Sequence, residues 1–337
     1  DSGNATKPGV GGLPRYQKVF GKGLVELGEM DPKVVAITAG MRDGTSTDLF
    51  GKAHPDRFFD VGIAEGHGVT FAAGLATEGI RPVVAIYSTF LQRGYDGIVH
   101  DVALQNLPVV FGMDRAGIAG ADGPTHHGTF DINYMLSVPG MTVTAPKDGS
   151  EMLGLLRMGV NHSAGPVSIR WPRDAVPAAV PHLSEIQPVE HGTWELLREG
   201  KDIAILAVGT MVLESVRAAE GLAKGGIEAT VVNCRFLKPL DMEVLGSLFP
   251  THTRILTVEE GAVVNGFGAF LARELTELPE AEGVQVKTLG IPDEFVAHGG
   301  RTELLREIDL DAQGIEEWAR AMIGGKKKTG IPALETA

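Results

Sequence analysis

The 337-residue sequence has almost no cysteine and no long apolar run. Its single cysteine, Cys234, excludes a disulfide framework and a cysteine-rich metal site, and it fits a reducing compartment. No run reaches the roughly 18 apolar residues that cross a bilayer, and the N-terminus lacks the basic and apolar regions of a signal peptide. We therefore expect a soluble, cytoplasmic protein that does not associate with membranes.

An excess of basic residues is also lacking. Lys and Arg number 30 against 43 Asp and Glu, so the formal net charge of −13 excludes general attraction to nucleic acid. P-loop, dinucleotide-binding and nucleophile-elbow motifs are missing, and the adjacent His126 and His127 do not have a zinc-ligand spacing. We expect no metal site within these residues, although a few local arginines can hold a small anion.

What the sequence does contain is a regular alternation of helical segments with short β-branched runs. Apolar runs at 34–39, 82–89 and 108–114 are separated by helical patterns, which is typical of parallel strands buried on both faces. Further strands are expected at 58–62, 142–145, 167–171, 202–209, 229–237, 254–260 and 284–291, and helices at 65–78, 90–104 and 150–161. The predicted fold class is α/β, with two doubly wound domains built on mainly parallel sheets.

Changes in composition mark the domain limits that we expect. Residues 1–14 are rich in Gly and lack an initiator Met, which predicts a flexible tail or linker on a fragment of a longer chain. Pro177, Pro181 and Pro188 interrupt any periodicity between the two units. The expected domains are 15–176 and 192–324, joined by a linker at 177–191 and followed by a flexible tail at 325–337.

Chemically informative side chains follow four of the predicted strands. Glu65 starts a helix, where its simplest role is that of a carboxylate favoured by the helix dipole. The other segments are 87–93, 114–128 and 170–173. Ligands of open α/β sheets bind beyond the carboxyl ends of the strands. Arg93, Arg115 and Arg173 therefore either converge on an anionic ligand or each pair with a local carboxylate.

Several longer segments carry a family resemblance. The most specific is VVAIYSTFLQRGYDGIVHDVALQNLPVVFGMDRAGIAGADGPTHHGTFDI at 83–132. RFLKPLD at 235–241, TVEEGAVVNGFG at 257–268 and LGIPDEFVAHG at 289–299 agree with it. From about residue 16 to residue 323 the sequence resembles the thiamine-diphosphate enzymes of the transketolase group, and most closely the 1-deoxy-D-xylulose-5-phosphate synthase family within it.

The resemblance implies a fold, cofactors and substrates. The first domain would bind the pyrimidine of the cofactor, and the second, a transketolase C-terminal domain, would mainly support assembly of a homodimer. Thiamine diphosphate and Mg²⁺ are the implied cofactors. Pyruvate and glyceraldehyde 3-phosphate are the implied substrates, in the first step of non-mevalonate isoprenoid biosynthesis, which also feeds thiamine biosynthesis.

The resemblance also implies roles for individual residues. Glu65 matches the glutamate that binds N1′ of the aminopyrimidine, Phe90 matches the aromatic residue stacked on that ring, and Ile63 is a further expected cofactor contact. The positions that match residues binding the acceptor or the intermediate are Tyr87, Arg93, Arg115, Asp122, His126 and Arg173. Glu65 and His126 are the expected catalytic residues.

One part of the family pattern is missing from these 337 residues. The family's N-terminal domain holds the diphosphate through Mg²⁺ with a Gly-Asp-Gly motif followed by an Asn, and no such segment is found in the sequence. We therefore expect the Mg²⁺ ligands to lie in that domain, and this chain to be inactive until it is joined to it.

Three alternatives remain open. A β subunit of a 2-oxoacid dehydrogenase E1 component would explain the missing domain, although residues 87–126 resemble the synthases. A C-terminal subunit of a split transketolase would use a ketose donor and would not decarboxylate pyruvate. A non-catalytic scaffold would have no need for this combination at the ends of strands: Glu65, Phe90, Arg93, Asp122, His126 and Arg173.

Overall fold

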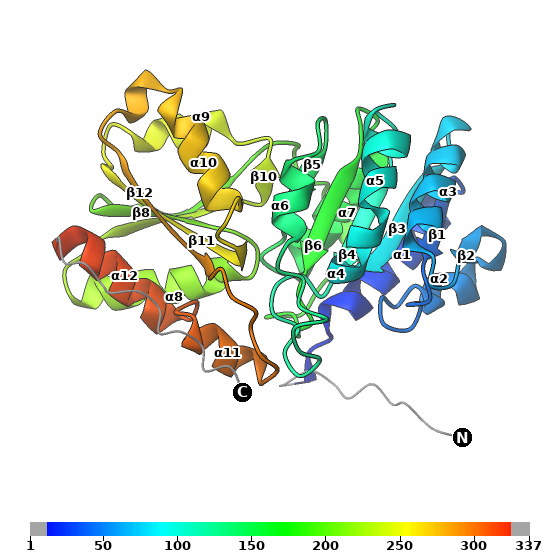
Figure 1. Ribbon diagram of the computed structural model, residues 1–337, viewed down its shortest axis with the longest axis horizontal. Coiled ribbons are helices and arrows are strands. Elements are labelled where there is room, and N and C mark those ends of the chain that lie inside the picture. Colours follow the sequence, from blue (N-terminus) through cyan, green and yellow to red (C-terminus); the bar gives the residue numbers. More distant parts are fainter. Residues whose placement is uncertain (1–11, 325–337) are drawn as a thin grey trace.

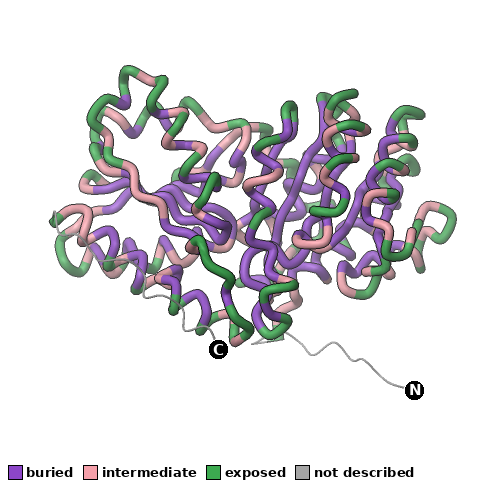
Figure 2. The backbone as a smooth tube through the Cα atoms, in the orientation of Figure 1, coloured by how far each residue is buried: buried purple, intermediate pink, exposed green. Residues whose placement is uncertain are grey.

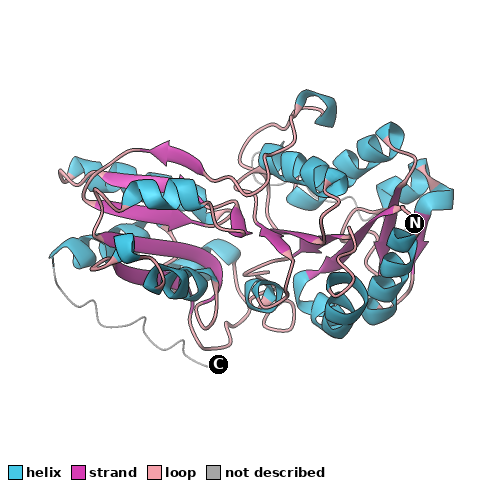
Figure 3. Cartoon of the chain, turned by 90° about the horizontal axis from the view of Figure 1, so that it is seen from above, coloured by secondary structure: helices cyan, strands magenta, loops and turns pink. Residues whose placement is uncertain are grey.

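The computed structural model describes residues 12–324, which form two α/β lobes side by side (Figure 1). In each lobe the strands form a buried central sheet, and exposed residues lie at the periphery (Figure 2). Helices cover both faces of each sheet (Figure 3), so the predicted α/β fold class with two doubly wound units is confirmed. Residues 1–11 and 325–337, where most of the two tails was predicted, lie outside the described residues. None of the helices within 12–324 is long and apolar enough to cross a membrane.

The first lobe contains a seven-stranded sheet in which only β10 runs antiparallel to its neighbour. In spatial order its strands are β10 (Phe236–Lys238), β5 (Thr142–Thr144), β6 (Val167–Trp171), β4 (Val110–Asp114), β3 (Arg81–Tyr87), β1 (Val34–Thr38) and β2 (Phe58–Asp60). Strands β1, β4 and β6 are buried at every residue, because both of their faces are covered by helices. The apolar runs thus correctly predicted the centre of this sheet.

Helices pack on the first sheet through their apolar sides. On one face α1 (Tyr16–Met30) packs beside α7 (Gly149–Asn161), and the Phe20 ring of α1 lies 4.6 Å from the Trp171 ring of β6. The Asp148 carboxylate accepts from Glu151 N and so caps the start of α7. The other helical elements of this lobe are α2 (Asp48–Ala53), η2 (Pro55–Arg57), α3 (Glu65–Thr77) and α6 (Asp131–Leu136).

The prediction of one regular helix at 90–104 is wrong. The segment is divided into α4 (Ser88–Leu91), η3 (Gln92–Gly94), α5 (Tyr95–Gly97) and the π-helical η4 (Ile98–Ala103). Gly94 and Gly97 lie against α3, where an added Cβ would come 2.8 Å and 3.3 Å from the side chain of Val69. Glycines at such close contacts weaken a regular helix, and the backbone changes its pitch around them.

The second lobe contains a five-stranded sheet. In spatial order its strands are β12 (Gln285–Ile291), β11 (Arg254–Ala262), β8 (Ile203–Ala207), β9 (Ala229–Asn233) and the antiparallel β7 (Glu195–Arg198). Its helical elements are α8 (Met211–Lys224), α9 (Met242–Leu248), α10 (Phe267–Thr276), η6 (Pro279–Ala281), α11 (Arg301–Glu307) and α12 (Ala312–Gly324), and η5 (Leu183–Glu185) lies in the preceding connection. Helices α9 and α10 cover one face of the sheet, and α8, α11 and α12 cover the other (Figure 1).

The single strand predicted at 229–237 is wrong, because two strands occupy it. β9 ends at Asn233, and β10 begins at Phe236 and joins the sheet of the first lobe, where Phe236 pairs with Thr144 of β5. The Lys238 ammonium then donates to the carbonyls of Leu136 and Val138. A segment of the second half of the chain thereby completes the first sheet.

Candidate active site

Strands β3, β4 and β6 end at the same level of the first sheet. Tyr87 is paired in register with Asp114, and Asp114 with Trp171. The segments that follow these strands therefore leave the sheet side by side, at the edge where open α/β sheets bind ligands. These segments carry the arginines and aromatic residues that the sequence indicated.

Glu65 is a buried acceptor at this edge. It is the first residue of α3 and is 3% exposed, so the helix dipole favours its carboxylate. Arg93 Nη1, from η3, donates to Glu65 Oε1 at 2.8 Å. Among residues 12–324 no donor is directed at Oε2. The Glu65 side chain thus has one oxygen held by Arg93 and one that can bind a ligand.

Phe90 is the centre of an aromatic group beside Glu65. Its ring is stacked near that of Tyr87, with centroids 5.7 Å apart, and meets the His126 ring edge-on at 5.2 Å. The Arg93 guanidinium lies over the Phe90 ring, 5.0 Å from its centroid. Phe90 is only half-buried, so a flat, partly exposed aromatic surface adjoins the buried carboxylate.

Arg115 follows β4 and lies against Tyr87. Its guanidinium is 3.7 Å from the Tyr87 ring centroid, and its Nη1 is 3.0 Å from the Asp114 carboxylate. Burial raises the pKa of Asp114 to about 6, although the neighbouring Arg115 opposes the shift. Burial also raises the pKa of Tyr87, against the opposing effect of Arg115.

Arg173 and Asp122 form a third ion pair in the same neighbourhood, with Nη1 and Oδ2 2.6 Å apart. Both are close enough to Tyr87 to affect the pKa of its phenol, which Arg173 lowers and Asp122 raises. The three arginines thus lie along one edge of the sheet, and each of them also pairs with a local carboxylate. The pairing alternative drawn from the sequence is therefore present in the geometry, and convergence of the three guanidinium groups on an anionic ligand stays a prediction.

The loop that carries Asp122 and His126 rests on the second lobe. His127 Nδ1 accepts from Ala119 N at 2.9 Å, so Nε2 carries the proton and donates to Ala297 O at 3.2 Å. Burial lowers the pKa of His127, which keeps the ring neutral in this arrangement. Glu260 Oε1 accepts from Ile118 N at 2.8 Å, and Arg301 pairs with the other oxygen.

Sequence reasoning assigned no role to His127 or Glu260, and no motif indicated that they hold this loop. It also missed Gly44, where an added Cβ would lie 1.7 Å from Tyr87 Oη. In contrast, the expected cofactor contact Ile63 is 87% exposed, in the turn that precedes α3. The roles of His127, Glu260 and Gly44 depend on contacts between segments that are distant in the sequence, so only the structure identifies them.

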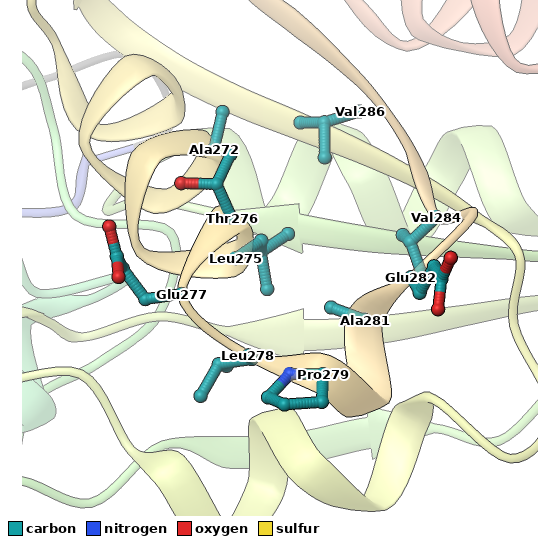
Figure 4. Close-up of a pocket in the computed structure, with 10 residues that line it drawn as sticks. All are labelled: Ala272, Leu275, Thr276, Glu277, Leu278, Pro279, Ala281, Glu282, Val284 and Val286. Carbon is teal, nitrogen blue, oxygen red and sulfur yellow. The ribbon is translucent and has the colours of Figure 1, made fainter.

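A sizeable hollow lies elsewhere. This open hollow of about 530 Å³ lies between α10, η6 and β12, and Figure 4 shows it lined mostly by aliphatic side chains, together with Thr276, Glu277 and Glu282. It holds none of the residues singled out above. A second hollow of about 400 Å³ is lined by Gln92, Tyr95 and Phe130, next to the Arg93 segment. Across 12–324 there is no cluster of three or more His, Cys, Asp or Glu side chains that could hold a metal ion.

Comparisons with curated proteins find relatives of twice this length. The 1-deoxy-D-xylulose-5-phosphate synthase of Aquifex aeolicus is 52% identical over 316 residues, which are 93% of this chain and 49% of the relative. That of Chlorobium phaeovibrioides is 48% identical over 323 residues, 96% of this chain and 50% of the relative. The chain therefore spans about half the length of the curated relatives it matches.

Solved structures agree in architecture. A split gene transketolase, in an inactive β4 tetramer, has a TM-score of 0.81 and 32% identity, and the match covers 93% of this chain and 99% of that one. A transketolase from Pichia stipitis has a TM-score of 0.75 over 96% of this chain and 48% of that one, at an identity of 18% that shows the fold alone.

Two family models match the chain. Residues 14–178 match the transketolase pyrimidine binding domain, and residues 192–315 match the transketolase C-terminal domain. The first segment forms most of the first lobe, and the second segment forms most of the second lobe. The chain belongs to the transketolase family, of which it contains the pyrimidine-binding and C-terminal domains.

Proposed function

We propose that this chain forms the pyrimidine-binding and C-terminal part of a 1-deoxy-D-xylulose-5-phosphate synthase. Such an enzyme decarboxylates pyruvate and transfers the two-carbon unit to glyceraldehyde 3-phosphate. The observation that carries the proposal is the identity of 48% to 52% with synthases over nearly the whole chain, against 32% with the split transketolase.

The residues at the sheet edge fit the pyrimidine half of thiamine diphosphate. A buried carboxylate with an unengaged oxygen, at Glu65, can hold or move a proton at a ring nitrogen, and the half-buried Phe90 can stack on a flat ring. When bound, the cofactor supplies a nucleophilic carbon and accepts the electron pair released by decarboxylation. The side chain of Ile63 is exposed, and it would become covered when the cofactor binds.

For the diphosphate half of the cofactor, residues 12–324 contain no cluster of His, Cys, Asp or Glu side chains that could hold its Mg²⁺. The proposal therefore places the Mg²⁺ and the diphosphate in the half of the synthases that this chain does not match. The complete enzyme is this chain together with that half, taken either from its own source or from the Aquifex aeolicus relative.

The acceptor would bind along the three arginines. Guanidinium groups hold a phosphate through paired N–H donors, and Arg115 and Arg173, which follow β4 and β6, both lie close to Tyr87 in space. His126 and Asp122, from one loop, supply a donor and an acceptor suited to a hydroxyl or aldehyde group. His126 is the candidate for proton transfer there, since an imidazole has one nitrogen that can donate a proton and one that can accept it.

The proposed enzyme is a cytoplasmic homodimer. Cys234 is buried as a free thiol, as is common for proteins of a reducing compartment. The exposed apolar side chains of Phe59 and Ile63, which adjoin α3, would be covered in a dimer or by the other half of the enzyme. Sedimentation of the complete enzyme measures its oligomeric state.

The test is an assay with pyruvate, glyceraldehyde 3-phosphate, thiamine diphosphate and Mg²⁺. The complete enzyme should release carbon dioxide and form the deoxyxylulose phosphate, and this chain alone should do neither. Turnover by the chain alone would contradict the assignment of the diphosphate site to the other half.

A split transketolase subunit is the second candidate, because the split transketolase chain is matched over 99% of its length. It would use a ketose phosphate as donor and release no carbon dioxide. Two-carbon transfer from a ketose phosphate, with no decarboxylation of pyruvate, would replace the synthase proposal by this one.

A further inference from the structure

Asp114 is a fully buried carboxylate that none of the roles above uses. It is the last residue of β4 and is 0% exposed. Its ion partner is the guanidinium of the next residue, Arg115, at 3.0 Å. Apart from Arg115, no group in the described part of the chain is directed at either carboxylate oxygen. A buried acidic group with so few partners is costly, so a function is the natural explanation for it.

The backbone of Arg115 is turned to meet Asp114. Its φ of 61° lies in the left-handed region, which is unfavourable for a residue with a long side chain. The turn is fixed from behind by Gly128, where an added Cβ would come 2.4 Å from Arg115 O. Gly117 and Gly128 also exchange backbone hydrogen bonds of 2.8 Å. The guanidinium is therefore brought back beside the strand end instead of extending into solvent.

Tyr87 and Gly44 contact the Arg115 guanidinium on its other sides. The Tyr87 ring lies 3.7 Å from it, and the Tyr87 hydroxyl end is packed on Gly44. On the Gly44 side, Arg115 Nη1 donates to Gly44 O at 3.4 Å. Nε of Arg115 is buried without a hydrogen-bond partner in the described residues. Nη1 is the nitrogen engaged by Asp114 and Gly44, and no group within 12–324 engages Nη2. Arg115 is thus held on several sides and retains Nη2 as a donor for a ligand.

We propose that Asp114 is a positioning residue, which holds the Arg115 guanidinium against Tyr87 so that Nη2 faces the anionic group of the acceptor. This inference rests on the proposed function for the identity of the acceptor. It adds a residue that touches no ligand itself and acts through Arg115 alone. Asp114 would then determine how strongly the enzyme distinguishes a phosphorylated acceptor from an unphosphorylated one.

The charge of Asp114 suits this role at neutral pH. Burial raises the pKa of its carboxyl to about 6, so that the group is still mostly ionised at pH 7.5. Asn has nearly the same shape but carries no charge, and its amide nitrogen would face the guanidinium as a second donor. The Asp114→Asn substitution therefore removes the attraction that holds Arg115 while it keeps the volume of the side chain.

The test compares two acceptors in the complete enzyme at pH 7.5. Asp114→Asn should raise the KM for glyceraldehyde 3-phosphate by about tenfold to a hundredfold, the effect of losing one charged hydrogen bond. The KM for glyceraldehyde, which has no phosphate, should change by less than about twofold. An equal change for both acceptors, no change, or tighter use of the phosphorylated acceptor would overturn the proposal.

Asp131→Asn is the matched control. Asp131 is also buried, and it pairs with the buried guanidinium of Arg170 at 3.0 Å. This change removes the same charge from another internal pair, so it should alter stability without altering the ratio of the two KM values. If Asp114→Asn does not fold, Asp114→Ser, with a smaller neutral side chain, is measured against the same expectations.

A second readout needs only this chain. Sulfate, which does not titrate near pH 7, should shift the Arg115 Nε–H signal in ¹⁵N NMR spectra, and Asp114→Asn should raise the sulfate Kd about tenfold. Failure of the complete enzyme to turn over would reject the proposed function and leave this measurement standing. An unchanged sulfate Kd in the variant, or no shift of the Arg115 signal in the wild type, would reject the positioning role.

Discussion

Arg93 and Glu65 form an ion pair of 2.8 Å between a buried carboxylate and a guanidinium that is 59% exposed on its side chain. The pair joins the start of α3 to η3 across 28 positions of the sequence. Because Arg93 also lies over Phe90, one arginine contacts both residues proposed to hold the pyrimidine ring. Any movement of η3 would therefore change the carboxylate and the stacking surface together.

Glu65→Gln should leave the fold intact and remove most of the activity of the complete enzyme. Gln retains the oxygen that Arg93 binds but cannot pass on a proton, so the rate should fall by about a hundredfold or more. The measurement is pyruvate-dependent carbon dioxide release, with circular dichroism as the check on folding. Glu78→Gln, at the exposed C-terminal end of the same helix, is the control and should be neutral. Activity that survives in Glu65→Gln would favour a scaffold.

Gly44→Ala should displace Tyr87. An added Cβ would lie 1.7 Å from Tyr87 Oη, and relieving that overlap should cost about 1 to 3 kcal/mol of unfolding free energy. Urea denaturation of the chain measures it. Gly74→Ala makes the same chemical change in α3, where nothing lies within 4 Å, and should stabilise by up to about 1 kcal/mol. Equal effects of the two changes would show that Tyr87 is not held by Gly44.

Arg301→Met should strongly destabilise the junction between the lobes. Arg301 pairs with Glu260, which is 2% exposed, and with Asp174 at 2.8 Å. Removing one partner leaves a buried carboxylate unpaired, at a cost of about 3 to 5 kcal/mol. Arg306→Met, in the same helix but at a side chain 66% exposed, should change the unfolding free energy by less than about 0.5 kcal/mol. A loss below about 1 kcal/mol for Arg301→Met would mean that Glu260 finds another donor.

Glu259 should make stability fall as the pH rises. It is fully buried, and burial raises the pKa of its carboxyl to about 7, although Phe267 N and Gly268 N donate to it. The folded state therefore holds the proton more tightly than the unfolded state. Stability that this group contributes at pH 4.5 is lost as the pH passes through 7, by up to about 3 kcal/mol.

Glu259→Gln tests this pH dependence. The unfolding free energy of the wild type, relative to that of the variant, should decrease between pH 4.5 and pH 8. Urea denaturation at several pH values within this range measures the difference. A difference that stays constant, or that increases with pH, would contradict the raised pKa of the Glu259 carboxyl.

The sequence predicted the parts of the site that depend on strand ends. Apolar runs located β3, β4 and β6, and parallel strands end at one edge of the sheet, so the approach of Tyr87, Arg115 and Arg173 could be expected from their positions in the chain. The pairing of each arginine with one carboxylate could not, because it depends on side-chain directions that a strand pattern does not contain.

Features that depend on contacts between distant segments were also hidden. The close packing of Gly44 against Tyr87 Oη arises because the loop after β1 lies against the end of β3. The breaks at Gly94 and Gly97 follow from the close approach of α3, since glycine alone is compatible with several backbone conformations. The three-residue strand β10 is too short for any periodicity to identify its sheet.

The position of β10 has a consequence for dissecting this molecule. A fragment that ends in the proline-rich connection would keep six strands of the first sheet and leave β5 as an open edge, a template for pairing with another chain. The lobe that contains the candidate site is therefore not a separable piece of sequence. After a cut between residues 177 and 191, the two products should stay associated as a nicked complex, because the second product contains β10, the edge strand of the first lobe's sheet.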